Sequence, residues 1–188
     1  MTITTAKWSL DDYHRMVDVG ILQQRHVELL HGEIIEMPPE GPIHADLSGD
    51  AADYLRQKLG SRVKVREAKP ITLPNASEPE PDIAIVQPIL YREHHPYPEQ
   101  VLWVIEFANT SLAKDRDVKR KIYAEAGIPE YWRVNLNASE LTVWRYERHP
   151  GNSAPQSNDY QFKQTFTQGT IRPVSFPEIS FSVEYFLT

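Results

Sequence analysis

The sequence of 188 residues predicts an α/β (α+β) fold, because short buried strands and longer amphipathic helices follow one another along it. Two apolar runs, Ile83–Val86 and 101–107, are rich in β-branched and aromatic residues, which is typical of strands buried on both faces. Two longer segments, 44–59 and 111–126, repeat apolar residues at the spacing of a helix with one buried face. These alternating segments indicate the fold class before any single motif is considered.

The composition predicts one globular domain that spans residues 1–188. The chain is 40% hydrophobic and 10% aromatic, which suits a substantial core and argues against wholesale disorder. The absence of cysteine excludes disulfides and a thiolate zinc site, and the sequence contains no signal peptide or long apolar run, so we expect a cytoplasmic protein without membrane contact. The formal net charge of -6 argues against broad, nonspecific adhesion to nucleic acid, but it is compatible with a local basic groove.

The N-terminal part predicts a short helix and then a hairpin. Ser9 can cap the helix, and Gly20 ends its apolar pattern. Segment 27–37 contains two short apolar runs on either side of His31 and Gly32, a dipeptide that fits a tight turn.

Four polar residues of the first half have two interpretations each. Glu28, within VELLHGEI, is either a solvated strand residue or a part of a metal site or its surroundings. His44, in the first turn of the first long helix, is either a surface histidine or a ligand. His94 and His95, in a proline-rich loop, could bind zinc only with further ligands, and the sequence does not space such ligands around them.

The remaining segments predict further strands. Segments 63–66 and 71–73 form either two short strands or one broken strand. Segments 130–135 and 141–146 alternate apolar and polar residues around a turn, as a hairpin does. The tail returns as strands or edge segments at 160–166, 170–174 and 179–186.

Two carboxylates belong to the buried strands. Asp82 opens the run Ile83–Val86, and Glu106 interrupts the run 101–107. A buried carboxylate is unfavourable unless it is paired or coordinates a metal, so Glu106 is the first functional candidate. Asp82 follows Pro81 and is equally compatible with an ordinary turn, but two adjacent strands could bring it to Glu106.

The helix after the second buried strand carries a lysine beside its apolar stripe. Thr110 or Ser111 can cap its start, and Gly127 with Pro129 supplies its stop. Lys119 adjoins the stripe, so its ammonium can reach inward. The expected stripe consists of Val118, Ile122 and Ala126.

Asp82, Glu106 and Lys119 are the residue types that metal-dependent phosphodiester hydrolysis requires. Carboxylate oxygens suit Mg²⁺ or Mn²⁺, ions that take their other positions from water and phosphate. Such an ion neutralises developing charge and lowers the pKa of a water molecule, while a nearby lysine orients that water as a base or offsets charge in the transition state.

The order of these residues resembles a known superfamily. PD in PDIAIV, the glutamate of VIEF, and then DRDVK and YAEAGIPEYW are similar to the PD-(D/E)XK restriction-endonuclease-like superfamily. The resemblance is closer to the Uma-two family, whose members are described as putative restriction endonucleases. It spans nearly the whole chain, including VELLHGEIIEM and HADLSG.

The resemblance implies a restriction-endonuclease-like core, in which helices flank a central mixed β-sheet, together with the N-terminal helix and hairpin. It also implies that Asp82, Glu106 and the backbone carbonyl of Phe107 bind Mg²⁺ or Mn²⁺, and that a lysine takes part in catalysis.

Two positions depart from the superfamily pattern. The superfamily lysine stands two positions after the acid, where this chain has Ala108. The family resemblance moves it to the following helix, where Lys119 matches and Lys121 is the second choice. Asn109 stands where relatives often carry aspartate, so it belongs with Glu28, His44 and Lys121 among the lower-ranked site residues.

The leading hypothesis is therefore a Mg²⁺- or Mn²⁺-dependent endonuclease that hydrolyses DNA phosphodiester bonds. The alternative is a noncatalytic nuclease-like module that binds nucleic acid or a protein partner, since a fold does not guarantee activity. Either protein could form a homodimer. The aromatic face with Trp132 and Trp144 is interpreted as core or a dimer surface more readily than as a platform for bases.

Overall fold

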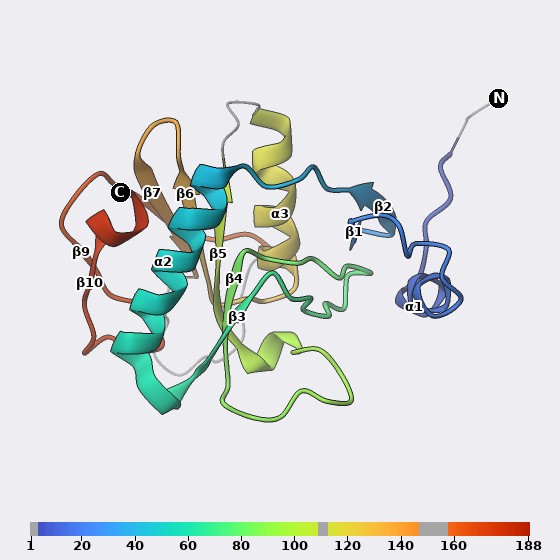
Figure 1. The fold of residues 1–188 in the computed structure, drawn as a ribbon, viewed down its shortest axis with the longest axis horizontal. Helices are drawn as coiled ribbons and strands as arrows, with labels where there is room; N and C mark the ends of the chain where they lie inside the picture. Colours follow the sequence, from blue (N-terminus) through green and yellow to red (C-terminus); the bar gives the residue numbers. More distant parts are fainter. Residues whose placement is uncertain (1–3, 109–112, 147–157) are drawn as a thin grey trace.

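The computed structural model describes residues 4–108, 113–146 and 158–188, and a mixed sheet lies at its centre (Figure 1). Its strands are β3 Lys64–Glu67, β4 Ile83–Val86, β5 Val101–Ala108, β6 Glu130–Asn135, β7 Glu140–Arg145 and β8 Phe162–Phe166. They lie side by side in this order; β5 and β6 are parallel, and the other neighbours are antiparallel. The predicted α/β (α+β) class with a central mixed sheet is confirmed.

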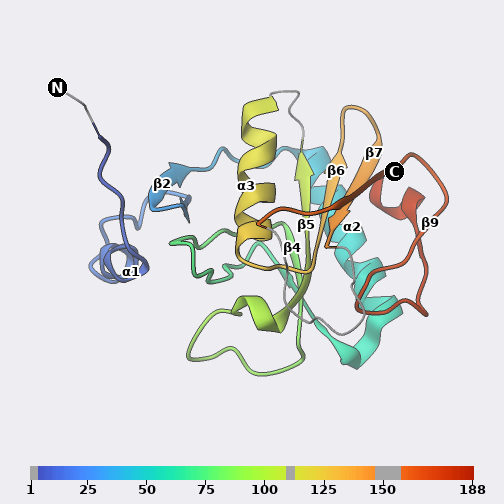
Figure 2. The same cartoon turned by 180° about the vertical axis from the view of Figure 1, so that it is seen from behind.

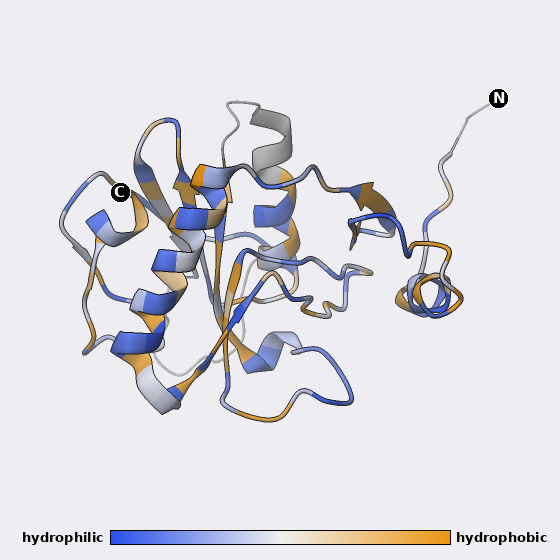
Figure 3. Ribbon diagram, viewed as in Figure 1, coloured by the Kyte–Doolittle hydropathy of each residue, from blue (hydrophilic) through white to orange (hydrophobic). Residues whose placement is uncertain are grey.

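Two helices cover opposite faces of the sheet, α2 at Pro42–Leu59 and α3 at Ala113–Glu125 (Figures 1 and 2). Successive strand side chains point to opposite faces, so Ile83 packs in the cluster of α2 and Ala84 in that of α3. Because both faces are covered, β4 is apolar throughout and β5 is apolar except at Glu106 (Figure 3). No helix in the described ranges combines the length and apolar character needed to cross a bilayer.

The same alternation fixes the direction of Glu106 in β5. Trp103 and Ile105 pack in the cluster of α2, whereas Val104 packs in the cluster of α3. Glu106 shares the parity of Val104, so it projects toward α3, where it is 8% exposed.

The buried stripe of α3 differs from the expected one. Val118 is 45% exposed, whereas Ile122, Tyr123 and Ala126 are buried. These three residues follow Lys119 at intervals of three, four and seven, so the inward face of the helix begins at Lys119 instead of Val118. The prediction was therefore right for Ile122 and Ala126 and wrong for Val118.

The end of α3 is fixed by Gly127. Its φ of 79° lies in the left-handed region, its N–H donates to the carbonyl of Ala124 at 2.8 Å, and the N–H of Ile128 donates to the carbonyl of Tyr123 at 2.9 Å. This pair of bonds is a Schellman motif, which satisfies the last carbonyls and turns the chain into β6. The predicted glycine stop is confirmed.

The N-terminal lobe, residues 10–36, stands beside the sheet on the side of α3 (Figures 1 and 2). It consists of α1 Leu10–Asp18, β1 Val27–Leu30 and β2 Glu33–Glu36. Ser9 caps α1, and the turn between the strands has positive φ at both His31 and Gly32. The predicted helix and hairpin are therefore confirmed.

Two expected strand regions are irregular. Segment 71–73 makes one isolated bridge, between Leu73 and Ser77, because the prolines that flank it, Pro70 and Pro74, have no N–H for a ladder. In the tail, regular pairing is limited to short strands, and a 3-10 helix replaces the expected end of the last strand. These elements are β9 Thr170–Ile171, β10 Phe181–Ser182 and η3 Val183–Phe186.

The aromatic hairpin belongs to the core. Trp132 is 0% exposed, Tyr131 is 2% exposed and Trp144 is 5% exposed. Their rings pack against other rings of both clusters, so Trp132 and Trp144 offer neither a dimer surface nor a platform for bases.

We predict that Gly127→Ala lowers the free energy of unfolding by about 1–2 kcal/mol, because a Cβ disfavours the left-handed conformation. Gly49→Ala is the matched control: Gly49 lies inside α2 with no atom within 4 Å of an added Cβ. It should raise the free energy of unfolding by roughly 0.5–1 kcal/mol. Urea denaturation of both variants tests this, and an equal change in both would contradict it.

Candidate active site and metal centre

Asp82 lies where β4 begins and links this strand to the end of β5. Its Oδ2 accepts a hydrogen bond of 2.6 Å from the backbone N–H of Phe107. The side chain is 12% exposed. An aspartate that merely initiates a turn would bond to nearby backbone, whereas this carboxylate is held by a residue 25 positions away.

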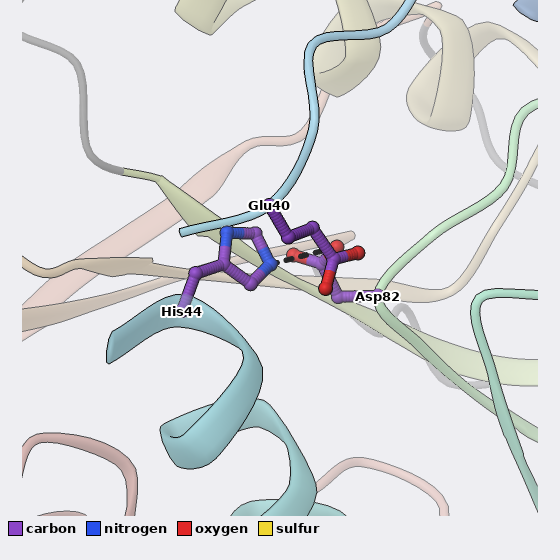
Figure 4. A group of neighbouring side chains, drawn as sticks. All are labelled: Glu40, His44 and Asp82. Atoms are coloured by element: carbon purple, nitrogen blue, oxygen red, sulfur yellow. Dashed lines mark ion pairs between the residues drawn. The ribbon is translucent and has the colours of Figure 1, made fainter. Parts of the chain in front are cut away.

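His44 and Glu40 approach Asp82 from the start of α2. Nε2 of His44 lies 3.1 Å from Oδ1 of Asp82, and ligand atoms of Glu40, His44 and Asp82 all lie within 4.8 Å of one another (Figure 4). The histidine side chain is only 13% exposed, so its surface interpretation is wrong. The Asp82 carboxylate raises the pKa of His44.

The contact between His44 and Asp82 does not satisfy the hydrogen-bonding capacity of the imidazole Nε2. Nε2 is buried, and although it is close to Asp82 it has no hydrogen bond of acceptable direction. An imidazole nitrogen between two carboxylates is a donor set that a divalent cation can use. Among the described residues, Glu40, His44 and Asp82 form the one group of this kind, so His94 and His95 gain no further zinc ligands.

Glu106 meets two side chains of α3. Its Oε1 accepts a hydrogen bond of 2.6 Å from the hydroxyl of Tyr123, and Nζ of Lys119 lies 3.1 Å from the same oxygen. Burial raises the pKa of Glu106 to about 7, although Lys119 opposes this change; Asp82 and Glu28 add to it. The carboxyl group is thus poised between its neutral and ionised forms near neutral pH.

Lys119 is an ammonium ion held between two carboxylates. Its Nζ lies 2.8 Å from Oε1 of Glu28 and 3.1 Å from Oε1 of Glu106, and its side chain is 16% exposed. Burial alone would lower the pKa of Lys119, but Glu106 and Glu28 outweigh burial and raise it. The group therefore stays protonated at neutral pH.

Glu28 reaches this cluster from β1. It is 1% exposed, so its interpretation as a solvated strand residue is wrong: the strand is covered on both faces. Its Oε1 accepts hydrogen bonds from Lys119 and from the backbone N–H of Glu80 at 3.0 Å, while its buried Oε2 has no hydrogen-bond partner.

The structure thus brings together most of the predicted site residues. Asp82, Glu106, Lys119, Glu28 and His44 converge at one end of the sheet. The backbone of Phe107 is adjacent through its bond to Asp82. By contrast, Lys121 is exposed, and Asn109 lies outside the described residues.

Two neighbours of the site were not predicted as members. Tyr123 stands four residues after Lys119, and this helical spacing was the available signal for a shared face. Glu40 lies in a proline-rich segment without periodicity, so only the tertiary structure brings it to His44.

Comparisons with known proteins identify the family and agree with the fold. The Uma2 family model, described as "Putative restriction endonuclease", matches residues 10–184. A crystal structure of a putative nuclease belonging to DUF820 from Anabaena variabilis is similar with a TM-score of 0.71 and 16% sequence identity, over 95% of this chain and 97% of that chain. At this identity the similarity establishes the fold alone. A search of curated proteins found no significant match.

The raised pKa of Glu106 predicts a pH-dependent loss of stability. The unfolded glutamate has a pKa near 4.5 and the folded one about 7, so the folded protein binds this proton more tightly, and the resulting stabilisation is lost as pH rises through 7. Between pH 5 and pH 8, with a metal chelator present, the free energy of unfolding of wild type should fall by on the order of 1–3 kcal/mol more than that of Glu106→Gln. Urea denaturation at both pH values measures this, and parallel pH profiles would refute it.

Proposed function

Because the chain belongs to the Uma2 family of putative restriction endonucleases, we propose that it is a metal-dependent endonuclease that hydrolyses DNA phosphodiester bonds. The observation that carries the proposal is the placement of the Lys119 ammonium 3.1 Å from Glu106, in a cluster that also contains the pair of His44 and Asp82. Two carboxylates, Asp82 and Glu106, near a fixed ammonium ion supply the groups that metal-dependent phosphodiester hydrolysis requires.

The metal would be held by Asp82, Glu106 and the backbone carbonyl of Phe107, with His44 and Glu40 as additional donors. The buried, unbonded Nε2 of His44 supports this donor set. Both contacts of Glu106 with α3 use Oε1, so Oε2 would be the oxygen that binds the cation. Carboxylates suit Mg²⁺ or Mn²⁺, and the imidazole favours Mn²⁺ of the two. When bound, the ion acts as a Lewis acid on the phosphate and lowers the pKa of water.

Lys119 acts as a charge stabiliser and not as a base. Its pKa is raised, so it has no free amine to accept a proton from water at neutral pH. A fixed ammonium can instead donate hydrogen bonds to a phosphate oxygen and offset the charge that develops in the transition state. Because it extends from α3, it supplies the charge that Ala108 cannot supply.

The noncatalytic module remains the second candidate, and Ala108 favours it. Residue 108 is the usual place of the superfamily lysine, and a chain that lost this lysine could keep the fold and lose the reaction. Metal binding separates the two candidates, since the endonuclease needs the cation and the module does not. The proposal also includes a homodimer, because cleavage of both strands of a duplex is most simply done by two symmetric sites.

We predict that Lys119→Met lowers the cleavage rate by roughly 10²–10³, the usual loss for one charge-stabilising donor. Lys121→Met is the matched control, because Lys121 is exposed on the same helix, and it should change the rate less than about twofold. The assay is cleavage of plasmid and single-stranded DNA with Mg²⁺, Mn²⁺ or chelator. Linear plasmid formed without a prior nicked species would support the homodimer. Full activity of Lys119→Met would refute the role of Lys119.

We predict that Asp82→Asn weakens Mn²⁺ binding by more than about tenfold and that His44→Ala weakens it by a smaller factor. Isothermal titration calorimetry of the purified protein measures both effects without any need for activity. Asp46→Asn is the control, since Asp46 is an exposed carboxylate in the first turns of α2. No Mn²⁺ binding by wild type, together with no cleavage, would favour the noncatalytic module.

A further inference from the structure

The lysine of the proposed site has its shortest ion pair with a residue outside the sheet. Nζ of Lys119 lies 2.8 Å from Glu28 and 3.1 Å from Glu106. Glu28 belongs to β1 in the N-terminal lobe, whereas Glu106 belongs to β5 of the sheet and Asp82 directly precedes β4. Two separate parts of the fold therefore share one ammonium.

Glu28 has the burial and bonding of a fixed anchor. At 1% exposure its carboxylate must be compensated, and Oε1 is compensated by Lys119 and by the N–H of Glu80. The N–H of Glu80 belongs to the segment that leads into Asp82, so the carboxylate is tied at once to the lysine and to the backbone that precedes β4.

The strand that carries Glu28 is attached to the body of the protein by backbone hydrogen bonds. The N–H of Glu78 donates to the carbonyl of Leu29 at 2.7 Å, and the N–H of Gly32 donates to the carbonyl of Ala76 at 2.8 Å. The N–H of His31 donates to Oγ of Ser77 at 2.8 Å. Strand β1, through Leu29, and the turn that follows it are therefore bonded to segment 76–78.

Close contacts between three histidines and carboxylates accompany these hydrogen bonds. His14 pairs with Glu78 at 2.9 Å, His26 with Glu80 at 3.3 Å, and His31 with Glu125 of α3 at 2.8 Å. Each pair joins the N-terminal lobe to a carboxylate of the body. A site residue on such a fixed element can hold its partner with little positional freedom.

Lys119 needs a second anchor if Glu106 serves the metal. A carboxylate that coordinates a cation shares its charge with that cation, which weakens its hold on an ammonium. Glu28 lies on β1, outside the central sheet, and is not among the proposed metal ligands. It can therefore keep the ammonium in place when Glu106 binds the metal.

We propose that Glu28 is a positioning residue that holds the Lys119 ammonium in the catalytic site, so that the N-terminal lobe completes this site. The assignment of a catalytic consequence rests on the proposed nuclease function. The positioning of Lys119 itself does not, and it can be measured separately.

The first test is chemical labelling of lysines. Reductive methylation followed by mass spectrometry compares Lys119 with Lys121, which is exposed on the same helix and serves as the internal reference. Glu28→Gln should raise the labelling rate of Lys119 relative to Lys121 by about tenfold, because the side chain is no longer held inside. Glu28→Asp, which keeps the charge but shortens the side chain, should raise it as well. Glu36→Gln, which removes an exposed carboxylate from the same hairpin, should leave the ratio unchanged.

The second test measures whether Glu28→Gln changes kcat more than it changes KM for DNA and the Kd for Mn²⁺. Glu28→Gln should lower kcat about 10- to 100-fold, while KM for DNA and the Kd for Mn²⁺ change less than about threefold. A merely structural role would instead lower the thermal midpoint and weaken DNA and metal binding together. Circular dichroism checks that each variant is folded, and Glu28→Asp replaces Glu28→Gln if the latter is not.

The outcomes distinguish this proposal from the nuclease function. If wild type cleaves DNA but Glu28→Gln leaves both the labelling ratio and kcat unchanged, the positioning role is refuted alone. If wild type cleaves nothing with any metal and Glu28→Gln still exposes Lys119, the nuclease function fails and the positioning of Lys119 stands.

Discussion

Three carboxylates converge on one buried ammonium, and the rest of the structure depends on this unequal charge. In the described part of the chain, Glu28, Asp82 and Glu106 all act electrostatically on Lys119, which is held by close contacts with two of them. Taking charges out of water is unfavourable unless the geometry compensates them, and Lys119 contacts only Glu28 and Glu106, while Asp82 lies beside His44. The raised pKa of Glu106 is one sign that the compensation is incomplete. The buried Oε2 of Glu28, which has no hydrogen-bond partner, is another.

Such an arrangement makes sense for a site that binds a positive ligand. A protein selected only for stability would replace the cluster with apolar side chains, since buried ion pairs are frequently no better than a well-packed core. Here the surrounding strands are already apolar on both faces, so the polar cluster is confined to the end of the sheet where Asp82 begins β4 and Glu106 approaches the end of β5. A cation that binds the folded state alone would also stabilise it, so the proposed metal binding would be coupled to folding.

The architecture brings charged residues from four distant segments to one place. The parity of β5 directs Glu106 to α3, the i, i+4 spacing on α3 aligns Lys119 with Tyr123, and the lobe adds Glu28. The departure at Ala108 is then understandable. Lys119 approaches Glu106 from α3, and the two carboxylates that contact its ammonium, Glu28 and Glu106, restrict the position of this side chain.

The sequence by itself determined the local elements and their order. Continuous apolar runs located the central strands, and helical spacing of apolar residues located the helices. Gly127 marked the end of α3, and an acid within an apolar run identified Glu106, because these signals depend on neighbours in the chain. Only the tertiary structure decided which polar residues meet. The sequence left Glu28 open between a solvated strand residue and a part of a metal site or its surroundings. Glu40 carried no periodic signal, and Val118 was expected on the buried face. The burial and partners of these residues are set by segments far away in the sequence, and local patterns contain no information about that packing.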